Sequence, residues 1–284
     1  MILVFGHTGQ VASELNNSIG VKTIGRDEAD LSVPNSCKKC IQHFQPKAVI
    51  NAAAYTAVDR AEEEEGLAFV INADAPTVMA QSCAEQKIPF VHISTDYVFN
   101  GKGNSAWKPN QPTDPQNAYG RSKLAGELGV RSSGAVHAIL RTSWVVSSHG
   151  ENFVKTMLKL SESQDELSVV SDQIGAPTPA RDIALACLKI ASDLQTAPEK
   201  SGTYHFCGKP FVSWYEFASE IFKLSERNVK LRTIPTSDYP TPAIRPLNSR
   251  LDCQSVTDVF GITQPSWHTE LKSILEELGV FDER

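Results

Sequence analysis

Hydrophobic and polar positions follow two periods in the first half of the chain. Short apolar runs rich in β-branched residues predict buried strands, and the longer segments between them carry apolar residues at helical spacing. The predicted strands are residues 2–5, 21–24, 48–51, 90–94 and 138–140. The predicted helices are residues 10–18, 36–44, 68–84 and 119–128. Strands that alternate with helices predict a parallel sheet with right-handed crossovers.

The second half of the chain has a different pattern. Residues 233–250 contain prolines at positions 235, 240, 242 and 246, a density that excludes a regular helix and predicts a fixed loop lining a site. Residues 269–278 predict a closing amphipathic helix. We therefore expect an α/β fold. It would combine a Rossmann-type doubly wound parallel sheet, formed by residues 1–145 and by later segments that return to it, with a smaller α/β domain formed mainly by residues 146–284.

Composition narrows the functional class. The 284 residues are 41% hydrophobic and 21% charged, as in ordinary globular proteins. A formal net charge of -6 argues against nucleic acid as a partner. Without an export signal or a long apolar run, we expect a cytoplasmic protein with no membrane partner and six reduced cysteines. Cys37 and Cys40 form a lone C-x-x-C, which we interpret as two neighbours on one helical turn.

A glycine-rich turn follows the first predicted strand directly. Gly6, Gly9 and Ala12 form the pattern G-x-x-G-x-x-A between a strand and a helix. The two glycines let the backbone turn tightly and approach a pyrophosphate, and the small Ala12 lets the helix pack on the sheet. The anion would lie at a helix N-terminus, where free N–H groups favour it. In this context the turn predicts that residues 1–145 bind NAD(P). Residues 146–284 would form the other wall of the cleft and mainly bind the substrate.

The residues after the second strand select the cofactor. An acidic residue there binds the ribose 2′-hydroxyl of NADH, whereas an arginine suits the 2′-phosphate of NADPH. Arg26 therefore favours NADPH and the adjacent Asp27 leaves NADH open, with a solvated surface charge as the alternative for Arg26. Asp30 and Leu31 follow a few residues later, where they would enclose the adenine.

Tyr119 and Lys123 form a Y-x-x-x-K motif on a predicted helix, and a spacing of four places both side chains on one helical face. A free tyrosine has a pKa near 10, which a neighbouring ammonium lowers by stabilising the phenolate. Tyr119 would act as a general acid as hydride arrives, a contribution of about 10²–10⁴ in rate. Ser94 and Thr95 supply a hydroxyl at the end of a predicted strand, where ligands of parallel sheets bind. Together with the glycine turn, these residues predict an NAD(P)-dependent oxidoreductase.

These motifs resemble the extended short-chain dehydrogenase/reductase family, and the similarity covers nearly the whole chain. In the first half it includes FGHTGQVASEL at 5–15, VINAAAYTAVDRAE at 49–62, STDYVFNG at 94–101 and NAYGRSKLAGE at 117–127. In the second half it includes RTSWV at 141–145, NFVKTML at 152–158, DQIGAPT at 172–178 and YPTPAIRPLNSRLD at 239–252. The resemblance implies reduction, by NADPH or NADH, of the 4-keto group of a dTDP-linked 6-deoxyhexose.

The resemblance, together with the two motifs, also implies individual roles. The expected catalytic residues are Thr95, Tyr119 and Lys123. The expected cofactor contacts are Gly6, Gly9, Gln10, Val11, Arg26, Asp30, Leu31, Ala53, Ala54, Tyr55, Thr56, Tyr119 and Lys123. The expected substrate contacts are Thr95, Asp96, Trp144, Arg245 and Arg250, the two arginines being directed to the diphosphate.

The chain departs from the family pattern at two places. Tyr55 stands where the family more often has histidine, a change that we expect to be tolerated. Some members dimerise through a magnesium ion bridged by glutamates, and Glu14 matches one of these, but Arg181 lies where another would be. Arginine cannot be a metal ligand here. We therefore expect no metal site, and a monomer or a homodimer that lacks this bridge.

Other functions stay open at this point. An enzyme acting on another nucleotide-linked keto-sugar, such as an epimerase or a dehydratase, would share the fold. A dehydratase needs an acid and a base after the strand-end threonine; Asp96 suits the first role, but Tyr97 is a poor base at neutral pH. A non-catalytic, cofactor-binding regulatory subunit would not need the three catalytic side chains, all of which are present. We therefore expect an enzyme that performs a simple reduction.

Overall fold

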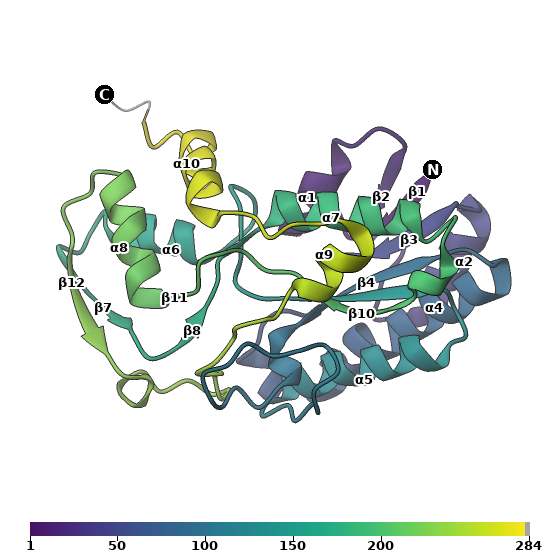
Figure 1. The fold of residues 1–284 in the computed structure, drawn as a ribbon, viewed down its shortest axis with the longest axis horizontal. Helices are drawn as coiled ribbons and strands as arrows, with labels where there is room; N and C mark the ends of the chain where they lie inside the picture. Colours follow the sequence, from purple (N-terminus) through teal and green to yellow (C-terminus); the bar gives the residue numbers. More distant parts are fainter. Residues whose placement is uncertain (282–284) are drawn as a thin grey trace.

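One parallel β-sheet forms the centre of the fold (Figure 1). The computed structural model describes residues 1–281. The strands of this sheet are β1 (Ile2–Phe5), β2 (Val21–Ile24), β3 (Ala48–Asn51), β4 (Phe90–Thr95), β5 (His137–Thr142) and β10 (Gly202–His205). They lie in the order β10-β5-β4-β3-β1-β2, and each neighbouring pair is parallel. The chain changes direction across the sheet between β1 and β3, so a ligand site is expected at the carboxyl ends of these strands.

Helices cover both faces of the sheet (Figure 1). One face carries α1 (Gln10–Asn16), α7 (Ala180–Asp193) and α9 (Gln254–Phe260), and the other carries α2 (Pro34–Phe44), α4 (Ala75–Gln86) and α5 (Ala118–Ser132). Leu15 and Ile183 fill the core on the first face, and Ile41 and Met79 fill it on the second. A sheet covered on both faces needs strands that are apolar throughout, as the predicted strands are. The Rossmann-type fold predicted from the sequence is confirmed.

The predicted elements differ from the structure mainly over residues 68–84 and through the second half of the chain, where only the closing helix was predicted. The helix predicted over residues 68–84 is divided into α3 (Glu65–Phe69), a π-helical turn (Val70–Asp74) and α4. Pro76 explains the division, because a proline has no N–H to donate to the carbonyl four residues earlier. Strand β10, at the sheet edge, was not predicted. It comes from the second half of the chain and pairs with β5.

A second apolar cluster lies beside the large sheet (Figure 1). It is formed by α6 (Phe153–Leu160), β7 (Glu166–Val170), α8 (Trp214–Leu224), β12 (Lys230–Ile234) and α10 (Trp267–Glu277). Strands β7 and β12 are parallel neighbours. Two short pairs complete the structure: β6 (Val145–Val146) with β9 (Thr178–Pro179), and β8 (Ile174–Gly175) with β11 (Val212–Ser213). The predicted closing helix corresponds to α10, and the division into domains at residue 145 stays a prediction.

The cysteines lie in the core. All six are free thiols with buried side chains. Cys37 and Cys40 are on the buried side of α2, and burial raises their thiol pKa to about 12 and about 11 respectively. They are therefore neighbours on one helix, as interpreted from the sequence. Within residues 1–281, no helix is both long enough and apolar enough to span a membrane.

Candidate active site

Helix α5 carries both residues of the Y-x-x-x-K motif. It begins after Asn117, whose side-chain oxygen accepts a 2.7 Å hydrogen bond from the N–H of Gly120. An asparagine in this position satisfies one of the free N–H groups at a helix start. The Asn117 amide also donates a 2.8 Å hydrogen bond to the carbonyl of Ile244, in the proline-rich loop. Asn117 thus joins this loop to the start of the helix that presents Tyr119 and Lys123.

Lys123 lies beneath the site. Only 2% of its surface is exposed, and its Nζ donates a 2.7 Å hydrogen bond to the carbonyl oxygen of Ile93 in β4. Burial lowers the pKa of this ammonium to about 8, whereas the Glu127 carboxylate acts to raise it. A charged amine is costly to bury, so its proton is held less firmly than that of a surface lysine.

Tyr119 lies against two other residues of the site. Its ring meets that of Tyr97 edge to face, with centroids 5.4 Å apart. Burial raises the pKa of the Tyr119 phenol above its ordinary value, and the Thr95 hydroxyl acts in the opposite direction. The lowering of the Tyr119 pKa expected from Lys123 was wrong for this structure, because burial raises that pKa and the Lys123 ammonium is directed to the Ile93 carbonyl. A phenol with a raised pKa is protonated at neutral pH, which is the state that a general acid requires.

Thr95 and Asp96 stand at the carboxyl end of β4. The Thr95 hydroxyl donates a 3.1 Å hydrogen bond to Asp96 Oδ1 and accepts one of 3.2 Å from the N–H of Tyr97. Burial raises the pKa of Asp96 to about 6. Within residues 1–281, Asp96 Oδ2 has no hydrogen-bond partner, and neither do the buried hydroxyls of Thr142 and Ser143 at the end of β5. Buried polar atoms without partners are rare, so their gathering at adjacent strand ends fits a site for a polar ligand.

The glycine turn has the geometry that a dinucleotide requires. Gly6 has a φ of +116°, which favours glycine, and a Cβ there would lie 3.3 Å from the backbone carbon of Ala52. Gly9 precedes α1, which no side chain of the described residues caps. A Cβ at Gly9 would meet no atom of residues 1–281 within 4 Å. Open space in front of an uncapped helix start fits a pyrophosphate, so the residues of the turn fit NAD(P).

Gln10 and Val11 contribute to this turn in different ways. The Gln10 side chain accepts 3.0 Å hydrogen bonds from the Ser147 hydroxyl and from the Asn152 amide. It therefore ties the glycine turn to the segment that leads into α6. Val11 is buried in the core on the first face of the sheet, which leaves its backbone N–H as the group suited to a phosphate.

The expected cofactor residues Ala53, Ala54, Tyr55 and Thr56 follow β3. The side chain of Asn72 holds this segment: its oxygen accepts a 2.8 Å hydrogen bond from the N–H of Tyr55, and its amide donates one of 3.0 Å to the Tyr55 carbonyl. The Tyr55 hydroxyl donates a 2.7 Å hydrogen bond to Glu64. Tyr55 thus has a protein partner of its own, and the expectation that its departure from the family pattern is tolerated stays a prediction.

Asn72 was not among the site residues expected from the sequence. This buried residue lies in the π-helical turn and also donates a 3.0 Å hydrogen bond to the hydroxyl of Ser122, the residue before Lys123. Asn72 therefore joins the cofactor-side segment to α5. The signal in the sequence was the interrupted helical pattern before Pro76, since π-helical turns are frequent at functional sites.

Arg26, Asp30 and Leu31 lie after β2, as predicted. Arg26 is exposed. An Asp30 carboxylate oxygen accepts a 2.8 Å hydrogen bond from the N–H of Ser32, and this bond, with a smaller effect of the Arg26 charge, lowers the Asp30 pKa. Leu31 packs at the edge of the core on the second face. The two charged side chains are thus close to each other beyond the carboxyl end of β2, in the position expected for the adenosine end of the cofactor.

Trp144 is held in a constrained conformation after β5. Its φ is +49°, which a side chain other than glycine rarely adopts. Its ring stacks on that of Trp214, with centroids 3.5 Å apart and planes 12° apart. A Cβ at Gly175 would lie 2.6 Å from the Trp144 ring, so only glycine fits beneath it. Residues kept in sparsely populated conformations are frequent at ligand sites, which supports the predicted role of Trp144 in substrate binding.

Both arginines expected at the substrate diphosphate have protein partners. Arg245 forms an ion pair with Asp59 and donates a 3.3 Å hydrogen bond to the Tyr97 hydroxyl. Arg250 donates a 2.9 Å hydrogen bond to the side-chain oxygen of Asn248. Arg245 thus has a compensating carboxylate that sequence analysis did not foresee, because Asp59 is distant in the chain. The role of the two arginines toward a diphosphate stays a prediction.

The region of Glu14 and Arg181 bears on the expected absence of a metal. Burial raises the pKa of Glu14, and the Arg181 charge acts to lower it. Arg181 is thus near enough to Glu14 to influence its titration. Within residues 1–281, no group of three or more metal-binding side chains is placed to hold a metal ion. The absence of magnesium in the working protein stays a prediction.

Comparisons with known proteins agree with this geometry. The family model described as the RmlD substrate binding domain matches residues 1–280. A dTDP-4-dehydrorhamnose reductase of Sinorhizobium fredii is 39% identical over 284 residues, which cover 96% of each chain. One of Burkholderia thailandensis is 42% identical over 286 residues, which cover 94% of this chain and 95% of that one.

Solved structures give the same result. A dTDP-4-dehydrorhamnose reductase of Clostridium acetobutylicum has a TM-score of 0.91 and 36% identity, covering 98% of this chain and 99% of its own. That of Bacillus anthracis, in complex with NADP, has a TM-score of 0.90 and 33% identity, covering 97% of this chain and 98% of its own.

The doubly wound sheet places a glycine turn and a Y-x-x-x-K helix at the carboxyl ends of its strands. This arrangement defines the chain as an NAD(P)-dependent oxidoreductase of the extended short-chain dehydrogenase/reductase type. Within that class, the chain belongs to the family of dTDP-4-dehydrorhamnose reductases that carry the RmlD substrate binding domain. The family resemblance inferred from the sequence motifs is therefore confirmed.

Proposed function

We propose that the protein reduces the 4-keto group of dTDP-4-dehydro-L-rhamnose to give dTDP-L-rhamnose, with NADPH as the favoured cofactor and NADH as the alternative. The arrangement that carries the proposal is the Tyr119 phenol beside the Thr95 hydroxyl, above the buried Lys123. Relatives named for this reaction match the chain over nearly its whole length, including the part beyond the cofactor-binding motifs. NADP in the Bacillus anthracis relative and the exposed Arg26 after β2 favour NADPH.

The side chains of this site supply the proton and the position for reduction. NADPH, when bound, supplies the hydride that adds to the carbonyl carbon. The Thr95 hydroxyl turns from Asp96 Oδ1 to donate its one hydrogen bond to the carbonyl oxygen, and Tyr119 transfers its phenol proton to the same oxygen. Lys123 compensates the negative charge that Tyr119 then carries. One hydride to carbon and one proton to oxygen complete the conversion of ketone to alcohol.

The neighbouring residues orient the sugar. Asp96 and the Ser143 hydroxyl present buried polar atoms at the ends of β4 and β5, which suit the hydroxyl groups of a hexose. Trp144 supplies an aromatic face held by its stacking on Trp214. Arg250, and Arg245 if it exchanges partners, would meet the diphosphate.

Tyr97 argues against a dehydratase, which would need a base in its position. Burial raises the pKa of the Tyr97 phenol, and its hydroxyl accepts a hydrogen bond from Arg245. A phenol whose pKa lies above 10 is protonated at neutral pH and cannot accept a proton from a sugar carbon. Simple reduction therefore fits the site better than dehydration.

The proposal is tested by following NADPH absorbance with enzymatically prepared dTDP-4-dehydro-L-rhamnose. We expect rapid oxidation by the wild type and a loss of kcat of about 10²–10⁴ in Tyr119→Phe, because that variant lacks the proton donor. NADPH affinity, measured by fluorescence, should change little. Tyr204→Phe is a matched control, since the Tyr204 hydroxyl donates a hydrogen bond to the carbonyl of Lys200, in the segment after α7 and away from the site.

Two outcomes would count against the proposal. No oxidation by a wild type that binds NADPH would indicate another keto-sugar or a regulatory subunit. Equal loss of activity and NADPH binding in Tyr119→Phe would mean that Tyr119 has a structural role.

We infer that the protein works in the cytoplasm, because its six free thiols would meet oxidising conditions outside it. We also infer that it works as a monomer or as a homodimer without a metal bridge. The charge next to Glu14 supports this inference, since Arg181 stands where a metal ligand would be needed.

A further inference from the structure

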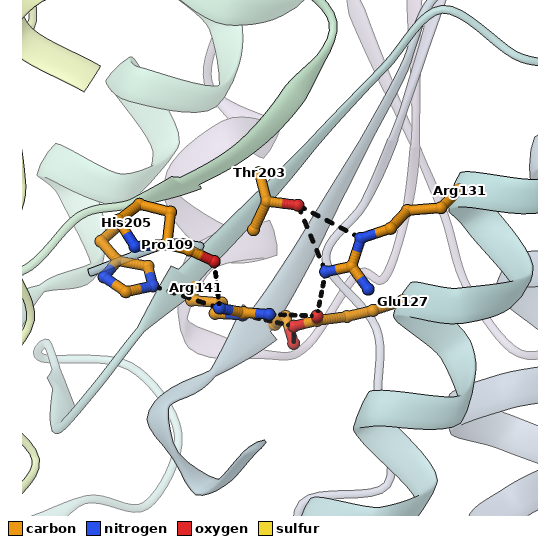
Figure 2. A network of polar contacts seen from close by, with 7 residues as sticks. Pro109, Glu127, Arg131, Arg141, Thr203 and His205 are labelled. Carbon is orange, nitrogen blue, oxygen red and sulfur yellow. Dashed lines mark hydrogen bonds and ion pairs between the residues drawn. The ribbon is translucent and has the colours of Figure 1, made fainter. Parts of the chain in front are cut away.

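Glu127 is a fully buried carboxylate on α5, one helical turn after Lys123. Arg141, in β5, donates to both of its oxygens, at 2.8 Å from Nε and 2.7 Å from Nη2 (Figure 2). Arg131 adds a 2.6 Å hydrogen bond from the next turn of α5. The hydroxyl of Ser94, in β4, donates another of 2.6 Å. Such complete pairing is what allows a charged carboxylate to be buried.

These bonds attach α5 to the strand that carries Thr95. Glu127 accepts from Ser94, the residue directly before Thr95. One turn earlier on the same face, Lys123 donates to Ile93 in the same strand. Two bonds one helical turn apart set both the position of α5 along β4 and its rotation about its own axis. The placement of Tyr119 relative to Thr95 follows from that register.

Arg141, in β5, extends this attachment to Pro109 and to strand β10. It donates 3.1 Å to the carbonyl of Pro109, and its Nη1 lies 3.4 Å from His205 Nε2 in β10 (Figure 2). Its guanidinium also lies over the Phe99 ring, 4.9 Å from the centroid. Only 1% of the Arg141 side chain is exposed. A two-point arginine–carboxylate contact with this many supports is rigid.

We propose that Glu127 is a positioning residue for the reduction: it holds α5 in register on β4, so that Tyr119 faces Thr95, and its negative charge favours the ammonium form of Lys123. This inference rests on the proposed function for its catalytic consequence. The electrostatic part of the inference concerns only the charge of Lys123. The pH dependence of NADPH binding measures that charge without any sugar substrate.

The charges around Lys123 support the electrostatic part. On its own helix, Glu127 raises the pKa of Lys123, which burial lowers to about 8. On β4, burial lowers the pKa of His92 well below its ordinary value, so that this neighbour is neutral. On β5, His137 titrates below its ordinary value because of burial, and Arg141 carries the positive charge already paired with Glu127. The Glu127 charge is thus the one in this group that opposes the cost of burying the Lys123 ammonium.

The experiment compares Glu127→Gln, Glu127→Asp and Arg131→Gln over a pH series, with kcat, KM and the NADPH dissociation constant as readouts. The alkaline limb is the fall of kcat, or of NADPH affinity, as pH rises and Lys123 loses its proton. Glu127→Gln removes the negative charge, so this limb should move to lower pH. For each unit that the Lys123 pKa falls, the ammonium fraction above that pKa falls about tenfold. Glu127→Asp keeps the charge, so its limb should stay close to that of the wild type even where misplacement of α5 lowers kcat.

Arg131→Gln is the matched control, because it removes the more exposed of the two guanidiniums that pair with Glu127. A positive charge is lost, so its alkaline limb should stay in place or move to higher pH, opposite to that of Glu127→Gln. If Glu127→Gln does not fold, the double variant Glu127→Gln with Arg141→Gln, in which both partners of the buried pair are neutral, is compared with Arg141→Gln alone, so that the two differ only in the Glu127 charge.

The pattern of pH limbs decides the inference. If the alkaline limbs of Glu127→Gln, Glu127→Asp and the wild type lie at the same pH, the electrostatic role is overturned. Unchanged kcat in Glu127→Asp and Glu127→Gln alike would overturn the positioning role. A wild type without activity toward dTDP-4-dehydro-L-rhamnose would refute the proposed function instead, and the pH dependence of NADPH binding would still test Glu127.

Discussion

Arg245, in the proline-rich loop, forms an ion pair with Asp59, which follows β3 on the cofactor side of the sheet. Asp59 also accepts a 3.1 Å hydrogen bond from the N–H of Ala243. One carboxylate therefore holds two positions of this loop. Because Arg245 also reaches Tyr97, whose ring touches that of Tyr119, the loop and the proposed proton donor are connected through a short series of contacts.

Replacing Asp59 by asparagine should therefore loosen the proline-rich loop. The side chains of Asp59 and Arg245 are 39% and 24% exposed, so solvent screens the pair and its loss is worth about 1 kcal/mol. We expect KM for the sugar nucleotide to rise about fivefold, with a smaller change in kcat. Steady-state kinetics measures both. Arg232→Gln, which breaks an exposed ion pair with Glu166 in the second cluster, should leave KM unchanged; an equal rise there would contradict this account.

The crossing of α5 over the π-helical turn allows no side chain at Gly126. A Cβ there would lie 2.0 Å from the backbone oxygen of Asn72, so Gly126→Ala must separate the two elements. Overpacking of this kind costs about 3 kcal/mol in the free energy of unfolding, and displacement of α5 should also lower kcat. Urea unfolding tests the first effect.

Gly66→Ala is the matched control for that substitution. Gly66 lies in α3, and its Cβ would meet no atom of residues 1–281 within 4 Å. We expect it to raise the free energy of unfolding by about 0.5–1 kcal/mol, because alanine favours a helix more than glycine does. Destabilisation of similar size in both variants would mean that the close crossing is not the cause.

Asp96 should make the wild type less stable as pH rises from about 4 to about 6. Its pKa is about 6 in the folded chain, above the ordinary value of 3.8, because the group is buried. The folded state thus holds this proton more tightly than the unfolded state, and the stability that it adds at acidic pH is lost as pH rises through this window. The loss is on the order of 3 kcal/mol.

Asp96→Asn removes this titration. Its free energy of unfolding, compared with that of the wild type, should improve between about pH 4 and pH 6 and then level off, because the amide stays neutral throughout. Urea unfolding of both proteins across that range measures the difference. A difference that does not depend on pH would show that Asp96 does not titrate in this window. Activity should fall in the variant, since functional sites retain groups that cost stability.

The sequence was sufficient to predict five of the six strands of the sheet and to propose the centre of the site. Strands buried on both faces, such as residues 48–51, form apolar runs that need no further information. The Tyr119–Lys123 face follows from helical spacing alone. Strand β10 was not predicted, although its Thr and Tyr favour strands, because it is only four residues long, begins with glycine, and becomes a strand by pairing with β5.

Partners distant in the chain account for most of what was missed. Glu127 has the same spacing from Lys123 that Lys123 has from Tyr119, so a charged residue on the buried face of this helix was visible in the sequence. Its partner Arg141 lies in the next strand, and no local period relates the two. The Asp59–Arg245 pair joins segments 186 positions apart, which only the folded structure brings together.

Arg26→Ala should reduce the preference for NADPH over NADH. Arg26 is exposed beyond the carboxyl end of β2, where a guanidinium suits the 2′-phosphate that NADH lacks. A charge-assisted contact at an exposed position is worth about 1.5 kcal/mol, so the dissociation constant of NADPH should rise about tenfold while that of NADH stays within about twofold. Fluorescence titration with each cofactor measures both. Asp27→Ala serves as the control, since it removes a neighbouring exposed charge of opposite sign and should strengthen NADPH binding slightly. Unchanged dissociation constants for both cofactors in Arg26→Ala would mean that Arg26 is a solvated surface charge, and the basis of the NADPH preference would then lie elsewhere.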